Sequence, residues 1–406
     1  MGRKINVTPE EQFAELKRGS FEIIPEDDFI KKLKKSYEKD EPLRVKFGAD
    51  PSRPDIHLGH TVVLNKLRLL QEFGHEIYFL IGDFTARIGD PSGKSKTRPI
   101  LTSEEIIENA QTYKDQVGKI LDMKKAKVVF NNDWLAKLTP FDIVKLVSQV
   151  TVSGILRRDD FSKRYAADQA IYLHEFLYPV FQGYDSVALK SDLELGGTDQ
   201  TFNLMVGRDL QKAYGQESQA ILTMPILEGL DGINKMSKSL DNYIGINESA
   251  ENIFGKVMSI SDEMMIKYYQ LLSRKKHQEI LEVVEGLKSG SKHPMEAKKE
   301  IAQELVEIYY PGEGKLERDK FEARFSKNKI PDDVQTLELA AQELDLIKIF
   351  SDLKFVKSNG EARRLMKQNA VKVDGTAFKE QFLSIESGSE YILKVGKLRM
   401  VKVKCV

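Results

Sequence analysis

Apolar and polar residues follow two periodicities in the N-terminal half of the chain. Short apolar runs predict strands over residues 43–47, 77–81 and 126–130. Between them, apolar residues recur every three or four positions, which predicts helices over residues 57–73 and about 103–121. Strands that alternate with helices of this length favour a parallel sheet with crossover helices, and therefore an α/β fold.

The pattern becomes mainly helical from residue 247 onward. Ser261 has the sequence context of a helix N-cap, and Pro294 suits a first helical turn. A polar stretch with a proline at residues 326–336 then predicts a linker. At 406 residues the chain is too long for one ordinary core, so we expect two or three domains.

The first candidate site is the segment His57-Leu58-Gly59-His60, which opens the first predicted helix. Unpaired N–H groups and the helix dipole attract phosphate to a helix N-terminus, and two imidazoles there can donate further hydrogen bonds. A metal site would need more ligands, and the other four of the six histidines are scattered along the chain. An ordinary surface helix is the remaining alternative.

The second candidate site is the polar loop Lys235-Met236-Ser237-Lys238-Ser239. Its two ammonium groups and two hydroxyls suit a polyphosphate whose negative charge grows as a bond to phosphorus breaks. The sequence has no G-x-G-x-x-G, and residues 89–95 form a Walker-A-like loop with one residue too few between its glycines. Alone, the lysine loop would be interpreted as a solvated turn. Together, the two segments resemble the signature of the class I aminoacyl-tRNA synthetases.

The composition excludes several classes of protein but does not indicate a binding partner. Lys+Arg and Asp+Glu are equal at 62 each, so any nucleic-acid surface must be local. The one cysteine, Cys405, excludes an internal disulfide framework and a cysteine-based metal site, which is typical of a reducing compartment. No apolar run approaches the ~18 residues of a spanning helix, and the first residues lack the apolar core of a signal peptide. We therefore expect a cytoplasmic protein without a membrane partner.

A polar helix face in the middle of the chain narrows the resemblance to the bacterial tyrosyl-tRNA synthetases. Tyr178, Gln182 and Asp185 are spaced four and three apart in an otherwise aromatic and apolar segment, so they share one helix face. The resemblance implies that Tyr178 and Gln182 hold the α-ammonium group of L-tyrosine and that Asp185 accepts a hydrogen bond from its phenol. An incidental polar stripe on a half-buried helix is the alternative interpretation.

Further matching segments imply the rest of a site for ATP and tyrosine. Beside the histidines, the residues that the resemblance assigns to ATP are Asp50, Ser52, Gly59, Gly197, Asp199, Lys235, Met236, Ser237, Lys238 and Ser239. The implied catalytic set consists of His57, His60, Lys235 and Lys238 together with Lys94 and Arg98, which would reach pyrophosphate. Tyrosine would also be held by Thr85, Asp90, Asn131 and Gln200. Mg²⁺ would arrive with ATP, held by phosphates and water, and no structural metal is expected.

One position departs from the family. Many members have a tyrosine two residues before the glycine that matches Gly48, and it shares recognition of the phenol with the aspartate. This chain has Lys46 there. Either Asp185 recognises the hydroxyl with other help, or Lys46 lies elsewhere.

The C-terminal part of the chain is locally basic. Residues 342–406 contain 13 Lys+Arg against 8 Asp+Glu. Ser358 to Glu361 has the pattern of a capping box, and a short strand and an Asp-Gly turn follow at 371–375. This resembles a small α+β RNA-binding module shared by a ribosomal protein, pseudouridine synthases and bacterial tyrosyl-tRNA synthetases. The residues that would then bind the tRNA backbone are Arg363, Arg364 and Lys367, with a solvated basic face as the alternative.

The resemblance covers nearly the whole chain. The domains that it implies are a Rossmann-like catalytic domain (1–245) with a dimer-interface segment at about 128–176, an α-helical anticodon-side domain (246–325), a linker (326–341) and an RNA-binding domain (342–406). The implied enzyme is a homodimeric tyrosine–tRNA ligase, which forms tyrosyl-adenylate from ATP and L-tyrosine, releases pyrophosphate and charges the 3′ end of tRNA(Tyr).

Three alternatives share part of this pattern. A tryptophanyl-tRNA synthetase has the same fold and motifs, but the polar helix face and the terminal module argue against it. A non-catalytic RNA-binding protein on a synthetase scaffold is disfavoured by the intact histidine and lysine segments. A nucleotidyltransferase acting on a small metabolite has no use for an RNA-binding module.

Overall fold

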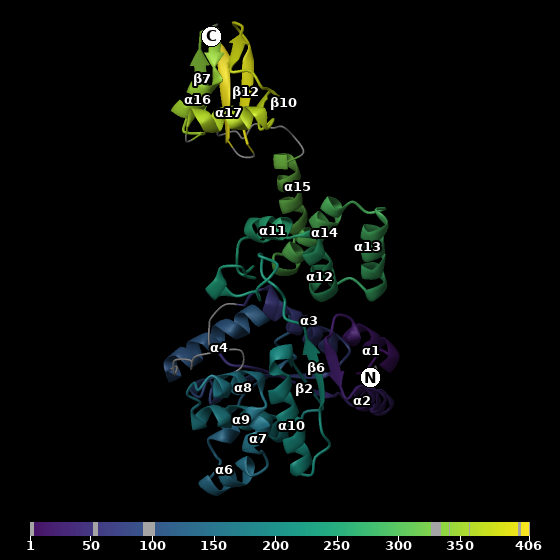
Figure 1. Cartoon of the computed structure of the whole chain (residues 1–406). Coiled ribbons are helices and arrows are strands. Elements are labelled where there is room, and N and C mark those ends of the chain that lie inside the picture. The colour runs from purple at the N-terminus through teal and green to yellow at the C-terminus, as the bar shows by residue number, and fades with distance from the viewer. Residues whose placement is uncertain are drawn as a thin grey trace. The chain divides into compact units, whose positions relative to one another are not determined.

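The structure is a computed structural model that falls into two compact units, residues 1–318 and 319–406, each described below by itself (Figure 1). The residues that it describes are 4–51, 56–91, 102–325, 334–340, 342–356, 358–396 and 399–405. No helix within these ranges is long and apolar enough to cross a membrane.

A six-stranded sheet forms the base of the N-terminal unit. Its strands are β1 (Glu22–Ile24), β2 (Arg44–Ala49), β3 (Glu76–Ile81), β4 (Lys127–Phe130), β5 (Leu193–Gly197) and β6 (Ala220–Met224), in the spatial order β1-β6-β5-β2-β3-β4. All neighbours are parallel except β1, which pairs antiparallel with β6. The three predicted strands correspond to β2, β3 and β4, and the prediction of a parallel sheet is confirmed; β1, β5 and β6 were not among the predicted strands.

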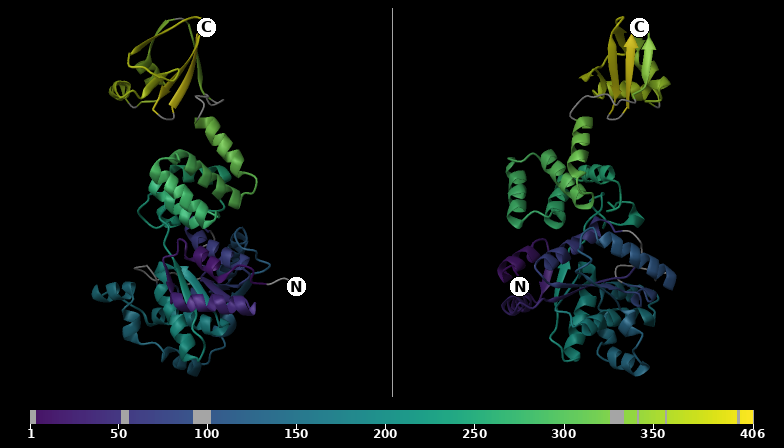
Figure 2. Two further views of the ribbon diagram at one scale, coloured as in Figure 1. Left: turned by 90° about the vertical axis from the view of Figure 1, so that its right-hand side faces the viewer. Right: turned by 180° about the vertical axis from the view of Figure 1, so that it is seen from behind.

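Helices cover this sheet on both sides (Figures 1 and 2). The long helices of this layer are α1 (Pro9–Lys17), α2 (Glu26–Lys39), α3 (Leu58–Glu72), α4 (Ser103–Val117), α9 (Leu173–Leu189) and α10 (Thr201–Ala213). Between β4 and α9 lie four short helices, α5 (Asn132–Leu135), α6 (Pro140–Val147), α7 (Val152–Leu156) and α8 (Asp159–Ala166). The two helices predicted from periodicity are α3 and α4.

The last part of the N-terminal unit, from residue 250 onward, is helical, as predicted. It consists of α11 (Ala250–Ser259), α12 (Asp262–Leu272), α13 (His277–Ser289), α14 (Pro294–Tyr309) and α15 (Gly314–Phe325), the last of which crosses the boundary between the units. Ser261 caps α12 by accepting from the Met264 amide at 3.2 Å, and Pro294 is the first residue of α14. Helix α12 packs on α3, so the helical part contacts the helix that begins at the two histidines of the candidate site.

The C-terminal unit is a small α+β fold. Its strands are β7 (Thr336–Leu339), β8 (Gln342–Asp345), β9 (Val371–Val373), β10 (Thr376–Ala377), β11 (Phe382–Ile385), β12 (Glu390–Val395) and β13 (Arg399–Cys405), and its helices are α16 (Leu346–Asp352) and α17 (Asn359–Lys367). Ser358 caps α17, and Asp374 and Gly375 form the expected turn with φ of 48° and 84°.

The range predicted for the linker, 326–341, extends too far toward the C-terminus. Strand β7 lies inside that range, pairs parallel with β13 and packs Leu337 and Leu339 against the hydrophobic core. The alternation of Thr336-Leu337-Glu338-Leu339 is a short strand pattern that the neighbouring polar, proline-containing residues obscure.

Candidate active site

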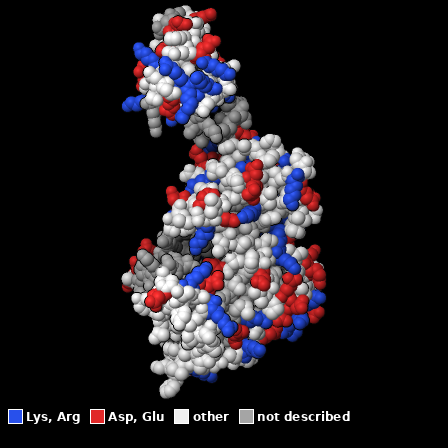
Figure 3. Space-filling model, in the orientation of Figure 1, with Lys and Arg blue, Asp and Glu red and all other residues white. Residues whose placement is uncertain are grey.

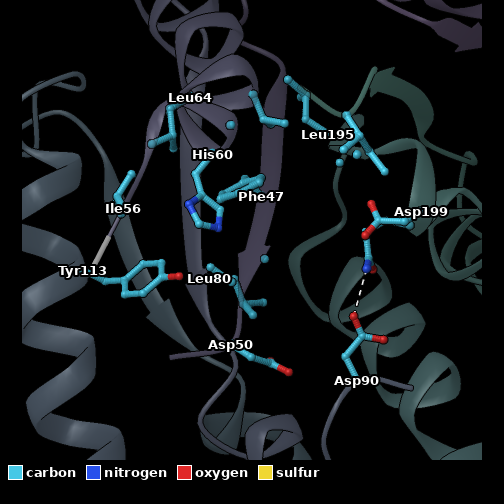
Figure 4. A pocket seen from close by; sticks show the side chains of 18 of the residues that line it. Phe47, Asp50, Ile56, His60, Leu64, Leu80, Asp90, Tyr113, Leu195 and Asp199 are labelled. Carbon is cyan, nitrogen blue, oxygen red and sulfur yellow. Dashed lines mark hydrogen bonds between the residues drawn. The ribbon is translucent and has the colours of Figure 1, made fainter. Parts of the chain in front are cut away.

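A cavity of about 710 Å³ opens where the parallel strands end, which is where open α/β sheets place ligands. It brings together most of the residues predicted for the site: Asp50, His57, Gly59, His60, Thr85, Asp90, Tyr178, Gln182, Asp185, Gly197, Asp199, Gln200, Lys235, Met236, Ser237, Lys238 and Ser239. His60, Asp50, Asp90 and Asp199 are seen around its interior in Figure 4.

Four of the predicted residues that the structure describes are not part of this lining. Asn131 lies behind the wall and is fully buried. Arg363, Arg364 and Lys367 are exposed on α17 of the C-terminal unit. Ser52, Lys94 and Arg98 lie outside the described residues.

The two histidines at the start of α3 are held as neutral rings. Nδ1 of His57 accepts from the Gly59 amide and Nδ1 of His60 accepts from the His57 amide, both at 3.2 Å. Burial, His60 and Lys238 lower the pKa of His57 to about 3, while burial and Lys238 lower the pKa of His60 to about 4. Because each Nδ1 accepts a hydrogen bond, the ring proton of each neutral imidazole lies on Nε2, which remains a donor.

The lysine loop is anchored by its central methionine and by an asparagine. Met236 is buried, and its amide donates to the Leu227 carbonyl at 2.9 Å. The Ser237 amide donates to Asn242 Oδ1 at 2.8 Å, while Nδ2 of Asn242 donates to the Lys235 carbonyl at 3.2 Å. These contacts fix the backbone and leave the two lysine side chains at the cavity, with Lys235 exposed and Lys238 half-buried.

The segment that follows the loop joins the two signature segments. The Leu58 amide donates to the Ile244 carbonyl at 2.9 Å, and His57 forms a β-bridge with Gly245. The first turn of α3 and the lysine loop are therefore held on the same side of the cavity although about 180 residues separate them in sequence.

At the other end of the cavity, Asp185 is a buried acceptor. Its Oδ1 accepts from Trp134 Nε1 at 2.8 Å and its Oδ2 accepts from Asn131 Nδ2 at 3.2 Å. Burial raises the pKa of Asp185 to about 7, against the opposing effect of Lys46 and of these two hydrogen bonds. Asp185 is thus close to the boundary between its neutral and ionised forms at neutral pH.

A chain of hydrogen bonds connects this acceptor to the centre of the cavity. Asn131 Nδ2 also donates to Thr85 Oγ1 at 3.1 Å, and Thr85 donates to Asp50 Oδ1 at 2.8 Å. The hydroxyl of Tyr178 donates to Asp50 Oδ2 at 2.9 Å. Asp50, which follows β2, is therefore oriented by Thr85, which follows β3, and by Tyr178 of α9.

Gln182 presents a buried polar atom that the described residues do not satisfy. Its Oε1 has no hydrogen-bond partner among them. A buried carbonyl oxygen without a donor is costly, so this atom marks a place where a ligand can donate. Its position on α9, one turn after Tyr178, agrees with the predicted polar helix face.

Lys46 lies under the cavity wall and not in its lining. Its side chain is fully buried, and Nζ donates to the Gln182 carbonyl and to Ser186 Oγ, both at 2.8 Å. Nζ also pairs with Glu194 Oε1 at 2.8 Å. Lys46 therefore supports helix α9 from behind, while the donors to the Asp185 carboxylate are Trp134 and Asn131.

The end of β5 forms the turn that carries Gly197 and Asp199, two of the residues that the resemblance assigns to ATP. A Cβ on Gly197 would lie 2.5 Å from Asp199 Oδ1, so a larger residue there would require the Asp199 carboxylate to move. Burial and the neighbouring Asp90 raise the pKa of Asp199, whereas Lys235 and Arg158 oppose the shift.

Sequence reasoning missed three residues of this site. Trp134, the one tryptophan of the chain, could have been suspected because it follows Asn131 by three residues. Tyr113 on α4 lines the cavity, and Arg158 lies behind Asp90. Neither belongs to a recognisable motif.

Comparison with known proteins identifies the family of the chain. Residues 38–326 match the family of class I tRNA synthetases for W and Y. The chain is 51% identical to a tyrosine–tRNA ligase of Syntrophotalea carbinolica over 97% of this chain and 98% of that protein, and 51% identical to one of Francisella tularensis over 96% and 97%.

Solved structures show the same fold. A tyrosyl-tRNA synthetase of Archaeoglobus fulgidus, complexed with L-tyrosine, has a TM-score of 0.62 and 26% identity, covering 76% of this chain and 99% of that one. A truncated mitochondrial tyrosyl-tRNA synthetase of Aspergillus nidulans has a TM-score of 0.63 at 20% identity, covering 78% and 94%. From the family match and the near full-length identity, the chain belongs to the tyrosine–tRNA ligases of the class I tRNA synthetases.

Proposed function

We propose that the cavity activates L-tyrosine with ATP and that the enzyme then charges tRNA(Tyr). The observation that carries this proposal is that one cavity joins two sets of residues. One set, the histidines and the lysine loop, suits phosphates. The other, Tyr178, Gln182 and Asp185, suits an ammonium group and a phenol.

The proposed first step needs little acid–base chemistry. A carboxylate oxygen of tyrosine attacks the α-phosphorus of ATP, a new P–O bond forms, and the bond to the β-phosphate oxygen breaks to release pyrophosphate. Neutral His57 and His60 donate from Nε2 to the phosphates, and Lys235 and Lys238 balance the charge that develops on the leaving group. Outside the described residues, Lys94 and Arg98 remain candidates for the same task.

The second proposed step moves the tyrosyl group to RNA. A hydroxyl oxygen of the terminal ribose attacks the carbonyl carbon of the adenylate and forms an ester bond. The bond from that carbon to the phosphate oxygen breaks, AMP leaves, and the hydroxyl proton passes to the phosphate or to solvent. We propose that Mg²⁺ enters with the ATP phosphates; among the described residues no group of three or more His, Cys, Asp or Glu side chains is placed to hold a metal ion. A cytoplasmic location, where tRNA is charged, is part of the same proposal.

The expected homodimer is supported by apolar side chains that point into solvent. Between residues 128 and 176, Phe141, Tyr165 and Leu173 are 86%, 71% and 81% exposed. Exposed apolar groups in one segment are typical of a protein interface. We therefore propose that this segment pairs with a second copy of the chain, which the molecular mass in solution tests.

Pyrophosphate exchange into ATP, measured in parallel with tyrosine, tryptophan and phenylalanine, tests the activity itself. Exchange should depend on tyrosine. Preference for tryptophan would instead support the related synthetase, and no exchange with any amino acid would reject the catalytic proposal.

Tyrosine affinity should depend on pH through Asp185. Its raised pKa of about 7 means that the carboxylate that accepts the phenol is present above pH 7 and is protonated below it. The Kd for tyrosine, measured without ATP, should therefore rise by up to about tenfold for each pH unit below 7. An Asp185→Asn variant should bind weakly and show a flat profile; an equally steep profile in that variant would assign the titration to another group.

Removal of the part of the C-terminal unit that follows α15 should separate the two steps. We propose that this unit binds tRNA, because Lys and Arg gather on the face seen in Figure 3 and the side chains of Arg363, Arg364 and Lys367 are exposed. A chain that ends at Phe325 should keep tyrosine-dependent exchange but lose tRNA charging by about tenfold or more at ordinary salt.

Charge removal in the full chain provides the matched test of that idea. Replacement of Arg363, Arg364 and Lys367 by glutamine should reduce the slope of log Kd against log salt by about 0.7–0.9 for each of these side chains that binds a phosphate in the wild-type complex. Normal charging by the shortened chain, or an unchanged salt slope, would contradict the assignment of tRNA binding to this unit.

A further inference from the structure

Arg158 is a buried arginine just behind the cavity, at the N-cap of α8. Its Nε pairs with Asp160 Oδ1 at 2.7 Å, Nη1 donates to Asn203 Oδ1 at 3.0 Å, and Nη2 lies 3.7 Å from Asp90 Oδ1. The rings of Phe161 and Phe202 lie 5.3 and 5.9 Å from the guanidinium carbon. The group is therefore fixed on several sides.

The contacts of Arg158 close a ring that includes two residues of the cavity. Asn203 Nδ2 donates to Gln200 Oε1 at 3.0 Å, and Gln200 Nε2 donates to Asp90 Oδ2 at 2.9 Å, the bond drawn at Asp90 in Figure 4. Asp90 and Gln200 line the cavity, whereas Arg158 and Asn203 do not. Arg158 and Asn203 thus orient the side chains of Asp90 and Gln200 in the cavity.

We propose that Arg158 is a positioning residue for the α-ammonium group of the amino-acid substrate, acting through Asp90 and Gln200. The inference rests on the proposed function: Asp90 is one of the residues assigned to tyrosine, it lines the same cavity as Tyr178 and Gln182, and its carboxylate suits the ammonium group of that substrate. It adds a residue that no motif indicated and that does not itself touch the substrate.

The ring gives Arg158 two effects on the cavity. First, by holding Asn203 Oδ1 it fixes which end of the Asn203 amide faces Gln200, and so which end of the Gln200 amide faces Asp90. Second, its charge acts on Asp90 at 3.7 Å, which is longer than a hydrogen bond. Arg158 thereby offsets the repulsion between Asp90 and Asp199 and keeps two carboxylates close together in a partly buried site.

Substrate analogues that keep or lack the ammonium group provide the test. Tyramine has the phenol and the ammonium group without the carboxylate; 3-(4-hydroxyphenyl)propanoate has the phenol and the carboxylate without the ammonium group. Each is used as an inhibitor that competes with tyrosine in pyrophosphate exchange, on the full-length enzyme and its variants.

In Arg158→Met, the KM for tyrosine and the Ki for tyramine should both rise by about tenfold, which corresponds to one charge-assisted hydrogen bond. The Ki for the propanoate and the KM for ATP should stay within about twofold of the wild type. Arg158→Lys keeps the charge without the fork of donors and should recover part of the loss.

A second variant and a matched control distinguish a positioning effect from a general loss of folding. Asn203→Leu breaks the same ring from the other side and should give the same pattern across the two analogues. Arg164→Met removes another buried arginine of α8, which pairs with Glu175 at 2.6 Å and does not line the cavity. It should lower thermal stability without changing the ratio of the two Ki values.

Three outcomes would overturn the inference. An unchanged KM for tyrosine in both Arg158→Met and Asn203→Leu, an equal rise in both Ki values, or the same pattern in Arg164→Met would each show that Arg158 has only a structural role. These results are distinct from failure of the proposed function, in which the wild-type enzyme itself shows no tyrosine-dependent exchange.

Discussion

Replacing Lys238 by alanine should slow the formation of tyrosyl-adenylate by about 10²–10³-fold while leaving the Kd for tyrosine within about twofold, by analogy with removal of one preorganised donor to a developing negative charge. The Lys238 ammonium lies 5.5 Å from the centre of the Tyr243 ring and close enough to His57 and His60 to lower the pKa of both. Its loop is anchored through Met236, so the side chain can turn toward phosphate without rearrangement of the backbone.

Single-turnover kinetics measure this effect, and a neighbouring lysine is the control. Lys256 also lies beside Tyr243, with its Nζ 5.1 Å from the ring centre, yet it pairs with Glu248 and does not line the cavity. Lys256→Ala should leave the rate of adenylate formation nearly unchanged. A Lys238→Ala enzyme with a normal rate and a raised Kd for tyrosine would show that Lys238 acts in binding and not in the transition state.

The fold of the catalytic part was largely predictable because its central elements carry strong local patterns. Strand β3 and the amphipathic helix α3 are buried over much of their length, and the apolar run that forms β2 contributes the buried Val45. Strand β1 has three residues and forms only by pairing with β6, about 200 residues away. Such a strand has almost no local signal, because its stability comes from the partner and not from its own sequence.

The candidate site divides in the same way. His57, His60 and the lysine loop could be predicted because short-range spacing defines them. The buried position of Lys46 could not be predicted from the sequence. Its partner Glu194 is on β5, and only the register of β2 with β5 brings the two residues together. Arg158 was hidden for a related reason, because its neighbours Asp90 and Asn203 come from distant segments.

Replacing Asp185 should remove most of the discrimination between tyrosine and phenylalanine, whereas replacing Lys46 should not. Asp185 lines the cavity and is oriented by Trp134 and Asn131, while Lys46 lies behind the wall. Asp185→Asn should lower kcat/KM for tyrosine by about 10²-fold, the effect of losing a hydrogen bond to a charged group, and leave phenylalanine nearly unaffected.

The Lys46 variants need a design that separates stability from specificity. Lys46→Met alone leaves the Glu194 carboxylate buried without its cation, which should cost about 3–5 kcal/mol of folding free energy. Lys46→Met combined with Glu194→Gln removes both charges and should restore much of that stability. The doubly substituted enzyme should still prefer tyrosine, because Asp185 accepts the hydrogen bond from the phenol. If it accepts phenylalanine as readily as tyrosine while Asp185→Asn still discriminates, the phenol is bound at the Lys46–Glu194 pair and not at Asp185.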